Sequence, residues 1–271
     1  MNPRCVGAAV PPAYRWSDEP MGPRLAPGAI VLSSFPSAGL AATVAAHYMI
    51  RTLNLARIAT LESDAGLPFA LVQGGQVQPP IRAYGRADLA LVVSEFPPSM
   101  SSIAGVAQAI LDGAEGRKAR AILCLEGVVP HPASEDGEGE AEPPAEVVWA
   151  AAARRDAETA KLLEPGGVRY LEDGVIGGVS GALLVAGLRR RIPVAVLLVS
   201  ARDSAGFPDH RAGAAMIETV DRILPEISID TKPLRSQAEM IERALRSQLE
   251  RQQVASEAAS AGERGQTSMY Q

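Results

Sequence analysis

A few short segments of this 271-residue chain carry residue types that could do chemistry. The first, residues 35–39 (FPSAG), follows an apolar run at 29–33 and precedes a helical pattern. Such a junction is where α/β sheets bind anions, because free N–H groups at the helix start face the ligand. Ser37, Ala38 and Gly39 are therefore a candidate anion loop. Neither GxGxxG nor GK followed by Ser or Thr is present, so a structural tight turn is the favoured interpretation.

Two other segments contain residue types that are common in active sites, but a structural role is the favoured interpretation for both. The glycine cluster at residues 174–181 (GVIGGVSG) fits neither the dinucleotide pattern nor the GxSxG elbow, because Ser180 is followed directly by Gly181. Asp209 with His210 resembles half of an acid–base pair, but Asp at a helix start is more often a cap. Spacing alone brings no nucleophile, base and orienting group together, so we assign no catalytic residue.

The C-terminal residues Met269, Tyr270 and Gln271 are different in kind. They follow the small, polar residues 256–268, which contain nothing to pack. A terminal carboxylate can pair with a lysine or with backbone amides, while Tyr270 offers a ring and a hydroxyl and Met269 adds apolar contact. The pattern predicts that these three residues are a ligand for a pocket on another protein.

The composition argues against a metal site, a nucleic-acid partner and a membrane-spanning segment. The cysteines Cys5 and Cys124 lie far apart, and the histidines His47, His131 and His210 are scattered, so we expect neither a metal site nor a cofactor. A formal net charge of -5 and 4% aromatic residues argue against nucleic acid as a partner. The most hydrophobic stretch, residues 179–188, is about half of a membrane span, and no secretory leader pattern is present. We expect a cytoplasmic protein.

Apolar runs alternate with helical patterns along most of the chain. Helices are predicted at residues 40–53, 103–111, 146–163, 177–188 and 209–224, and a hairpin across Gly74-Gly75 is predicted to join 69–72 to 77–84. Further strands are predicted at 29–33, 55–63, 87–94, 119–125, 168–171 and 193–200, the last being the most hydrophobic and expected at the centre of the sheet. This alternation predicts an α/β fold with a mainly parallel sheet and helices on both faces.

The domain organisation follows from changes in composition. We expect an extended, proline-rich arm at residues 1–27 and an α/β domain at 28–232, with an acidic mobile loop at 135–144. A C-terminal helix at 233–256 and a flexible tail at 257–271 complete the chain. In that helix the apolar residues recur at four, three and four positions and form one seam, which we expect to build an oligomer or to orient the tail: Leu234, Ala238, Ile241 and Leu245.

The order of these motifs resembles the proteasome assembly chaperone family, and specifically its archaeal homo-oligomeric members. The resemblance covers about residues 29–238. It rests on the strand, loop and helix at 30–40, the glycine cluster, the strand at 193–200, Asp209 with Ala214-Ala215, and Ile229-Asp230 before Leu234. Two departures are Ser37, where the family usually has a glycine-rich pattern, and the acidic loop, which looks like a local insertion.

The resemblance implies a three-layer α/β/α sandwich similar to nucleoside phosphorylases, with no known catalytic role. It also implies that residues 269–271 are similar to the hydrophobic–Tyr–any-residue tail that inserts between α-subunits of the 20S proteasome. The expected function is an ATP-independent homo-oligomer that holds proteasome α-subunits during assembly or caps the finished ring. The alternatives are a phosphorylase-like or ligase-like enzyme that uses the 35–39 loop as an anion site, and a scaffold for other client proteins.

Overall fold

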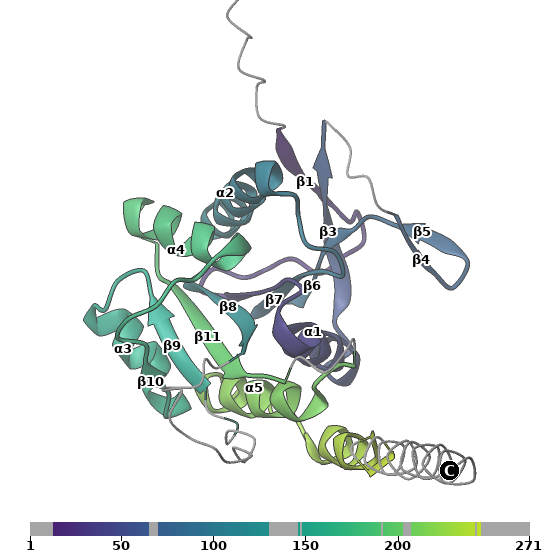
Figure 1. Cartoon of the computed structure of the whole chain (residues 1–271). Helices are drawn as coiled ribbons and strands as arrows, with labels where there is room; N and C mark the ends of the chain where they lie inside the picture. Colours follow the sequence, from purple (N-terminus) through teal and green to yellow (C-terminus); the bar gives the residue numbers. More distant parts are fainter. Residues whose placement is uncertain are drawn as a thin grey trace, which may run out of the picture. The chain divides into compact units, whose positions relative to one another are not determined.

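The computed structural model describes residues 13–64, 70–129, 146, 148–190, 192–202, 207–241 and 243–244. The chain divides into two compact units, Met1–Ile229 and Asp230–Gln271. The first unit contains the sheet and the helices that cover it (Figure 1). The expected acidic loop at 135–144 and the expected tail at 257–271 lie outside the described residues.

A nine-stranded sheet with the order β1-β3-β6-β7-β2-β8-β11-β9-β10 organises the first unit. The four strands at its centre, β7, β2, β8 and β11, are parallel to one another. On one side β1, β3 and β6 continue the sheet with antiparallel pairings, and on the other β9 runs antiparallel to β11 and parallel to β10. The strands are β1 Tyr14–Asp18, β2 Ile30–Ser34, β3 Ala56–Ser63, β6 Ile81–Arg86, β7 Leu89–Ser94, β8 Ala121–Val128, β9 Val148–Ala152, β10 Arg169–Tyr170 and β11 Val194–Ser200.

Helices cover both faces of this sheet and make three layers (Figure 1). α1 Ala41–Thr52 and α5 His210–Ile223 pack together on one face, and α2 Met100–Gly116 and α4 Gly178–Arg190 pack together on the other. α3 Ala157–Leu163 and the short 3-10 helix Glu164–Gly166 complete the side near α5. The predicted α/β fold is therefore confirmed, with the parallel pairing concentrated in the central strands.

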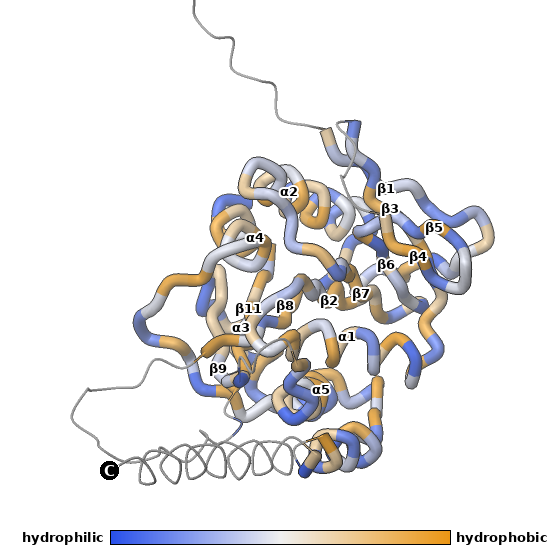
Figure 2. Tube along the Cα trace, turned by 45° about the vertical axis from the view of Figure 1, so that its right-hand side comes forward, coloured by the Kyte–Doolittle hydropathy of each residue, from blue (hydrophilic) through white to orange (hydrophobic). Residues whose placement is uncertain are grey.

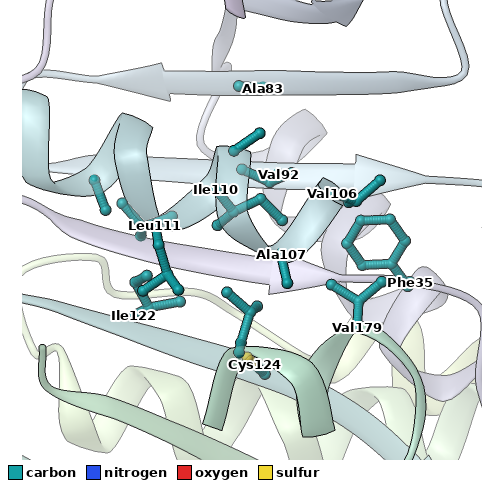
Figure 3. Close-up of a cluster of buried hydrophobic side chains, with 14 of the residues drawn as sticks. Phe35, Ala83, Val92, Val106, Ala107, Ile110, Leu111, Ile122, Cys124 and Val179 are labelled. Carbon is teal, nitrogen blue, oxygen red and sulfur yellow. The ribbon is translucent and has the colours of Figure 1, made fainter. Parts of the chain in front are cut away.

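The central strands are almost entirely buried because helices cover both of their faces. Every residue of β2, β7 and β11 is buried, which is typical of parallel strands in α/β proteins. On the face toward α2, side chains such as Val92, Ile122 and Cys124 pack against Ile110 and Leu111 (Figure 3). Figure 2 shows the same property as hydrophobic colour concentrated along the inner strands.

On the opposite face of the sheet, helix α1 packs close to the strands. Strand alternation and register place Leu32 in one row with Leu91 and Leu123, and all three are completely buried. α1 contacts β2, β7 and β8 through side chains that are mostly methyl groups, so its backbone can lie near the sheet. These fully buried residues of α1 are Ala41, Ala42, Ala45, Ala46 and Met49.

The prediction of a helix at residues 146–163 is wrong for the first half of this range. Residues 148–152 form β9, which pairs with β11 from Val199 to Ala195. The helix α3 starts only after Asp156, whose carboxylate accepts a hydrogen bond from the N–H of Thr159 at 3.0 Å. The alanines made the segment look helical, but strand pairing decided its structure, because β propensity depends strongly on the surrounding sheet.

Two other elements also differ from expectation. Residues 14–18, expected within an extended arm, form the edge strand β1, and the Trp16 Nε1–H donates to the carbonyl of Ala109 at 2.8 Å. The strand at 193–200 is one of the four parallel strands at the centre of the sheet, as expected, and lies between β8 and β9. The hairpin across Gly74-Gly75 is present as β4 Leu71–Gln73 and β5 Gln76–Gln78, whereas β6 leaves it and joins the large sheet.

We predict that replacing Ile110 by Ala lowers the free energy of unfolding by about 2–5 kcal/mol, because it leaves a cavity between α2 and the sheet. Urea unfolding followed by circular dichroism measures this change. Gln108→Ala, on the exposed side of the same helix, is the matched control and should change stability by less than about 0.5 kcal/mol. Equal effects of the two substitutions would contradict this packing.

Candidate functional site

The carboxyl ends of the four parallel strands meet at one edge of the sheet, and polar side chains gather there. After β2 the chain forms β3, β6 and β7, which all lie on one side of β2 in the sheet. Helix α2 then connects β7 to β8, which lies on the other side of β2. The strand order therefore reverses between β2 and β8, and open α/β sheets bind their ligands at such a point. The loop at residues 35–39, the end of β8 and the starts of α4 and α5 all lie at this edge.

The loop that contains Ser37, Ala38 and Gly39 packs closely onto its neighbours. The hydroxyl of Ser37 accepts a hydrogen bond from the N–H of Gly127 at 2.8 Å, and the carbonyl of Gly39 accepts one from the N–H of Asp209 at 2.7 Å. Gly39 has a φ of 58°, and a Cβ there would lie 2.7 Å from the carbonyl of Arg202. The loop thus joins β8 to the start of α5 through close backbone contacts.

The charges around this loop favour a structural turn over an anion site. Asp209 is buried, and its Oδ1 accepts hydrogen bonds from the N–H groups of Arg211 and Ala212 at 3.1 and 3.0 Å, which caps α5. Its Oδ2 accepts from the N–H of Arg202 at 2.9 Å. A second carboxylate, Glu126, precedes Gly127 on β8. Asp209 also lies 3.6 Å from the Nε of Arg202, so the charged groups beside the loop are already engaged with one another and with backbone N–H groups.

Glu126 and Ser180 form a buried pair at the same edge. The Ser180 hydroxyl, in the first turn of α4, donates to Glu126 Oε2 at 2.6 Å. Burial raises the pKa of Glu126 to about 7, although the hydrogen bond from Ser180 acts in the opposite direction. A Cβ at Gly181 would collide with the carbonyl of Ile176, so the tight turn that leads into α4 requires glycine at this position.

Cys124 lies two residues before Glu126 on the same face of β8 and is fully buried. Burial raises the pKa of the thiol, and the nearby charge of Glu126 raises it further. The reactive form of a cysteine is the thiolate, so this environment keeps Cys124 inert at neutral pH. Cys124 therefore acts as a small apolar side chain in the core.

An ion-pair cluster lies farther along this edge, at the end of β7. Arg82 is 1% exposed, and its guanidinium donates to Glu95 Oε1, to the carbonyl of Pro79 at 2.7 Å and to the hydroxyl of Tyr84 at 3.2 Å. His47 of α1 places Nε2 3.1 Å from the same Glu95 oxygen. Burial favours the neutral acid, but the hydrogen bonds from His47 and Arg82 outweigh it and lower the pKa of Glu95 to about 2.

Sequence reasoning did not find either cluster. In the sequence His47 is only one of three scattered histidines, and Glu126 lies just after the strand predicted at 119–125. A charged residue inside or directly after a strand of apolar residues, as at Arg82 and Glu126, is the signal that could have found them, because such a group must be paired when it is buried. Their partners come from distant parts of the chain, which spacing does not relate.

Over the described part of the chain there is no group of three or more His, Cys, Asp or Glu side chains placed to hold a metal ion. The same residues include no helix that is long and apolar enough to cross a membrane. Most polar groups at the sheet edge are engaged with one another and with backbone atoms, although Glu95 Oε2 is buried without a hydrogen-bond partner. Their geometry stabilises loops and helix starts.

The other residues predicted to bind partners lie in the second unit. Residues 232–241 and 243–244 are helical, and the spacing of Leu234, Ala238 and Ile241 places them on one face of this helix. Asp230 Oδ1 accepts a hydrogen bond from the N–H of Lys232 at 3.0 Å at the helix start. Leu245, Met269, Tyr270 and Gln271 lie outside the described residues.

The fold and these contacts define a three-layer α/β protein whose sheet edge is occupied by structural contacts in the described residues. Residues 31–249 match the model of the PAC2 family, and the chain belongs to this family. An uncharacterized protein of Methanocaldococcus jannaschii is 27% identical over 220 residues, which are 80% of this chain and 84% of that relative.

Two solved structures from Pyrococcus furiosus are similar to this chain. PbaA, described as an archaeal homolog of proteasome-assembly chaperone, has a TM-score of 0.73 and 26% identity, and the match covers 95% of this chain and 100% of PbaA. PbaB, described as an archaeal proteasome activator, shares the fold with a TM-score of 0.68 at 24% identity, over 87% of this chain and 98% of PbaB. The family resemblance predicted from the motifs is confirmed.

We predict that Glu95→Gln destabilises the protein by about 3–5 kcal/mol at pH 7, because it leaves the buried Arg82 without its counter-charge. The folded-state pKa of Glu95 lies below its usual value, so the stabilisation is present above about pH 4.5 and is lost as the pH falls toward 2. Unfolding by urea at a series of pH values should show this loss in the unaltered protein and not in the variant. Glu62→Gln, on the exposed side of β3, is the control.

The Glu126 carboxyl should make the stability of the unaltered protein depend on pH with the opposite sign, and Glu126→Gln should remove this dependence. The raised pKa means that stability is full below about pH 4.5 and falls as the pH rises to about 7, when the buried carboxyl must ionise. The variant keeps a neutral group beside Ser180, so it should gain stability relative to the unaltered protein over this range, by up to about 3 kcal/mol. Thermal unfolding at pH 5 and pH 8 measures the difference, and parallel profiles would refute it.

Proposed function

We propose that this protein is a proteasome-binding assembly chaperone or activator that acts without ATP and docks Met269, Tyr270 and Gln271 into pockets between α-subunits of the 20S proteasome. The likeness to PbaA carries the proposal, because it extends over 95% of this chain at 26% identity. PbaA is described as a homolog of proteasome-assembly chaperone and PbaB as a proteasome activator. The hydrophobic–Tyr–any-residue order of residues 269–271 fits a ligand for such a pocket.

In this proposal the α/β domain is a carrier and the tail is the ligand. Residues 257–268 are small and polar, and a flexible chain of this length has an r.m.s. reach on the order of 20 Å. Several tails on one homo-oligomer bind by avidity, so contacts that are weak individually add together. The seam of Leu234, Ala238, Ile241 and Leu245 would help to form the oligomer or to orient the tails. The site of action is the cytoplasm.

The sheet edge gives little support to the enzyme alternative. Ser180 is buried and hydrogen-bonded to Glu126, and Asp209 is committed to capping α5. Ser37, Ala38 and Gly39 are packed against backbone atoms of β8 and of residue 202, which leaves no open space for phosphate at this loop. We therefore assign this edge a structural role and place recognition of the partner outside it.

Deleting residues 269–271 should abolish binding to 20S proteasome, or to its isolated α-ring, while the fold and the oligomer remain intact. Co-sedimentation measures binding, and light scattering and circular dichroism measure mass and fold. Tyr270→Ala should reproduce the loss, because it removes the ring and the hydroxyl that enter the pocket.

Gln271→Ala is the matched control for the tail, because the motif accepts any residue at this position, and it should bind like the unaltered protein. Undiminished binding by the truncated protein would exclude the tail as the ligand. In that event a rise of the melting temperature with phosphate or a nucleoside would favour the enzyme alternative.

A further inference from the structure

A groove of about 620 Å³ lies at the edge of the sheet opposite to the polar contacts described above. Residues 18–27, which lie between β1 and β2, form one side of it, and residues 116–118 at the end of α2 form the other. Because β2 and β8 begin shortly after these two segments, the groove is at the amino ends of the parallel strands. Its volume is within the range of sites that bind small molecules.

One side of the groove is held in place by its own backbone. Three of the lining residues are prolines, whose rings fix the φ angle: Pro20, Pro23 and Pro27. The N–H of Glu19 donates to the carbonyl of Ile58 at 2.8 Å, and the N–H of Gly28 donates to the carbonyl of Lys118 at 2.8 Å. These bonds tie this segment to β3 and to the end of α2. A ligand therefore meets a preformed surface and does not have to order it.

The groove carries positive charge that the described residues do not neutralise. Its two carboxylates are each paired with an arginine: Asp18 with Arg117 and Glu19 with Arg57. Arg24 and Lys118 also line the groove, and their exposed side chains have no ion-pair or hydrogen-bond partner in the described part of the chain. Two uncompensated cations thus line one groove in a protein whose formal net charge is -5.

The backbone conformation of Lys118 does not favour a lysine. Its φ of 54° is in the left-handed region, where a residue with a Cβ is strained. The N–H of Lys118 donates to the carbonyl of Glu115 at 2.9 Å, and the N–H of Ala119 donates to the carbonyl of Ala114 at 2.9 Å. This pattern ends many helices and usually has glycine at the left-handed position. The position therefore exchanges backbone strain for a positive charge beside the groove.

An apolar surface adjoins these cations. Leu25 and Ile58 line the groove and also line a smaller cavity of about 30 Å³ between the sheet and α2. Trp16 borders this cavity, and its Nε1–H is already bonded to the carbonyl of Ala109. A molecule in the groove therefore meets both carbon and positive charge.

We propose that this groove binds a small carboxylic acid, with its carboxylate paired to Arg24 and Lys118 and its apolar body against Leu25 and Ile58. A carboxylate fits the two cations, because hydrogen bonds between charged groups are the strong ones. An inorganic anion would leave the apolar surface uncovered, and a neutral apolar molecule would leave the cations without a counter-charge. The inference goes beyond the proposed function, because the groove lies in the unit Met1–Ile229 and uses no residue of the C-terminal tail.

Isothermal titration calorimetry of the full-length protein with octanoate tests the role of charge. Replacing both cations, by Arg24→Gln and Lys118→Gln together, should weaken octanoate binding at least tenfold. Arg120→Gln is the matched control and should bind like the unaltered protein, because Arg120 is an exposed cation that does not line the groove. Circular dichroism should show the same fold for all three proteins. Equal affinity of the double variant and the control would overturn the proposal.

The second test compares ligands on the unaltered protein. Octanamide has the same chain as octanoate without the charge, and acetate has the charge without the chain. Each should therefore bind at least tenfold more weakly than octanoate. Binding of acetate or of octanamide as tightly as octanoate would overturn the proposal, because it would show an anion site only or an apolar site only. Absence of octanoate binding at millimolar concentration would also overturn it.

Lys118→Gly separates a role in binding from a role in the helix end. Glycine adopts the left-handed region without strain, so the melting temperature should not fall, whereas the affinity for octanoate should fall. A lower melting temperature with unchanged affinity would assign Lys118 to the helix end and overturn its role in binding. All of these variants retain residues 269–271, so tail-dependent binding to the proteasome should be unaffected, and the two proposals fail independently.

Discussion

The burial of the four parallel strands on both faces is the constraint on which the rest of this structure depends. Strands β2, β7 and β11 expose no side chain to water, so each face needs a layer of helices. The alanine-rich face of α1 satisfies the need on one side, and the larger aliphatic residues of α2 and α4 satisfy it on the other. The three layers follow from this requirement.

The same constraint explains the polar groups at the sheet edge. Where a buried strand ends, charged and hydroxyl groups enter a region with little water and must find partners inside the protein. Arg82 meets Glu95 and His47, Glu126 meets Ser180, and Asp209 meets the backbone of α5. The pKa values of the two glutamates shift in opposite directions, because burial dominates at Glu126, whereas at Glu95 the hydrogen bonds from His47 and Arg82 outweigh burial.

The sheet edge where many α/β proteins bind a ligand is filled by loops of this protein. In many α/β proteins this edge holds a ligand, but here the loop at residues 35–39 fills the space between β8 and the start of α5. In the proposed function, recognition uses the C-terminal residues 269–271 instead, a short segment whose affinity would depend on several copies acting together.

The sequence alone determined the local elements and the family. Apolar runs predicted the central strands, the glycine pair predicted the hairpin turn, and Asp209 was recognised as a helix cap, because each depends on neighbouring residues. Only the tertiary structure decided that residues 148–152 pair with β11 instead of starting a helix, that residues 14–18 add an edge strand, and that Arg82, Glu95 and His47 meet. These outcomes depend on contacts between residues far apart in the chain, for which local periodicity carries no information.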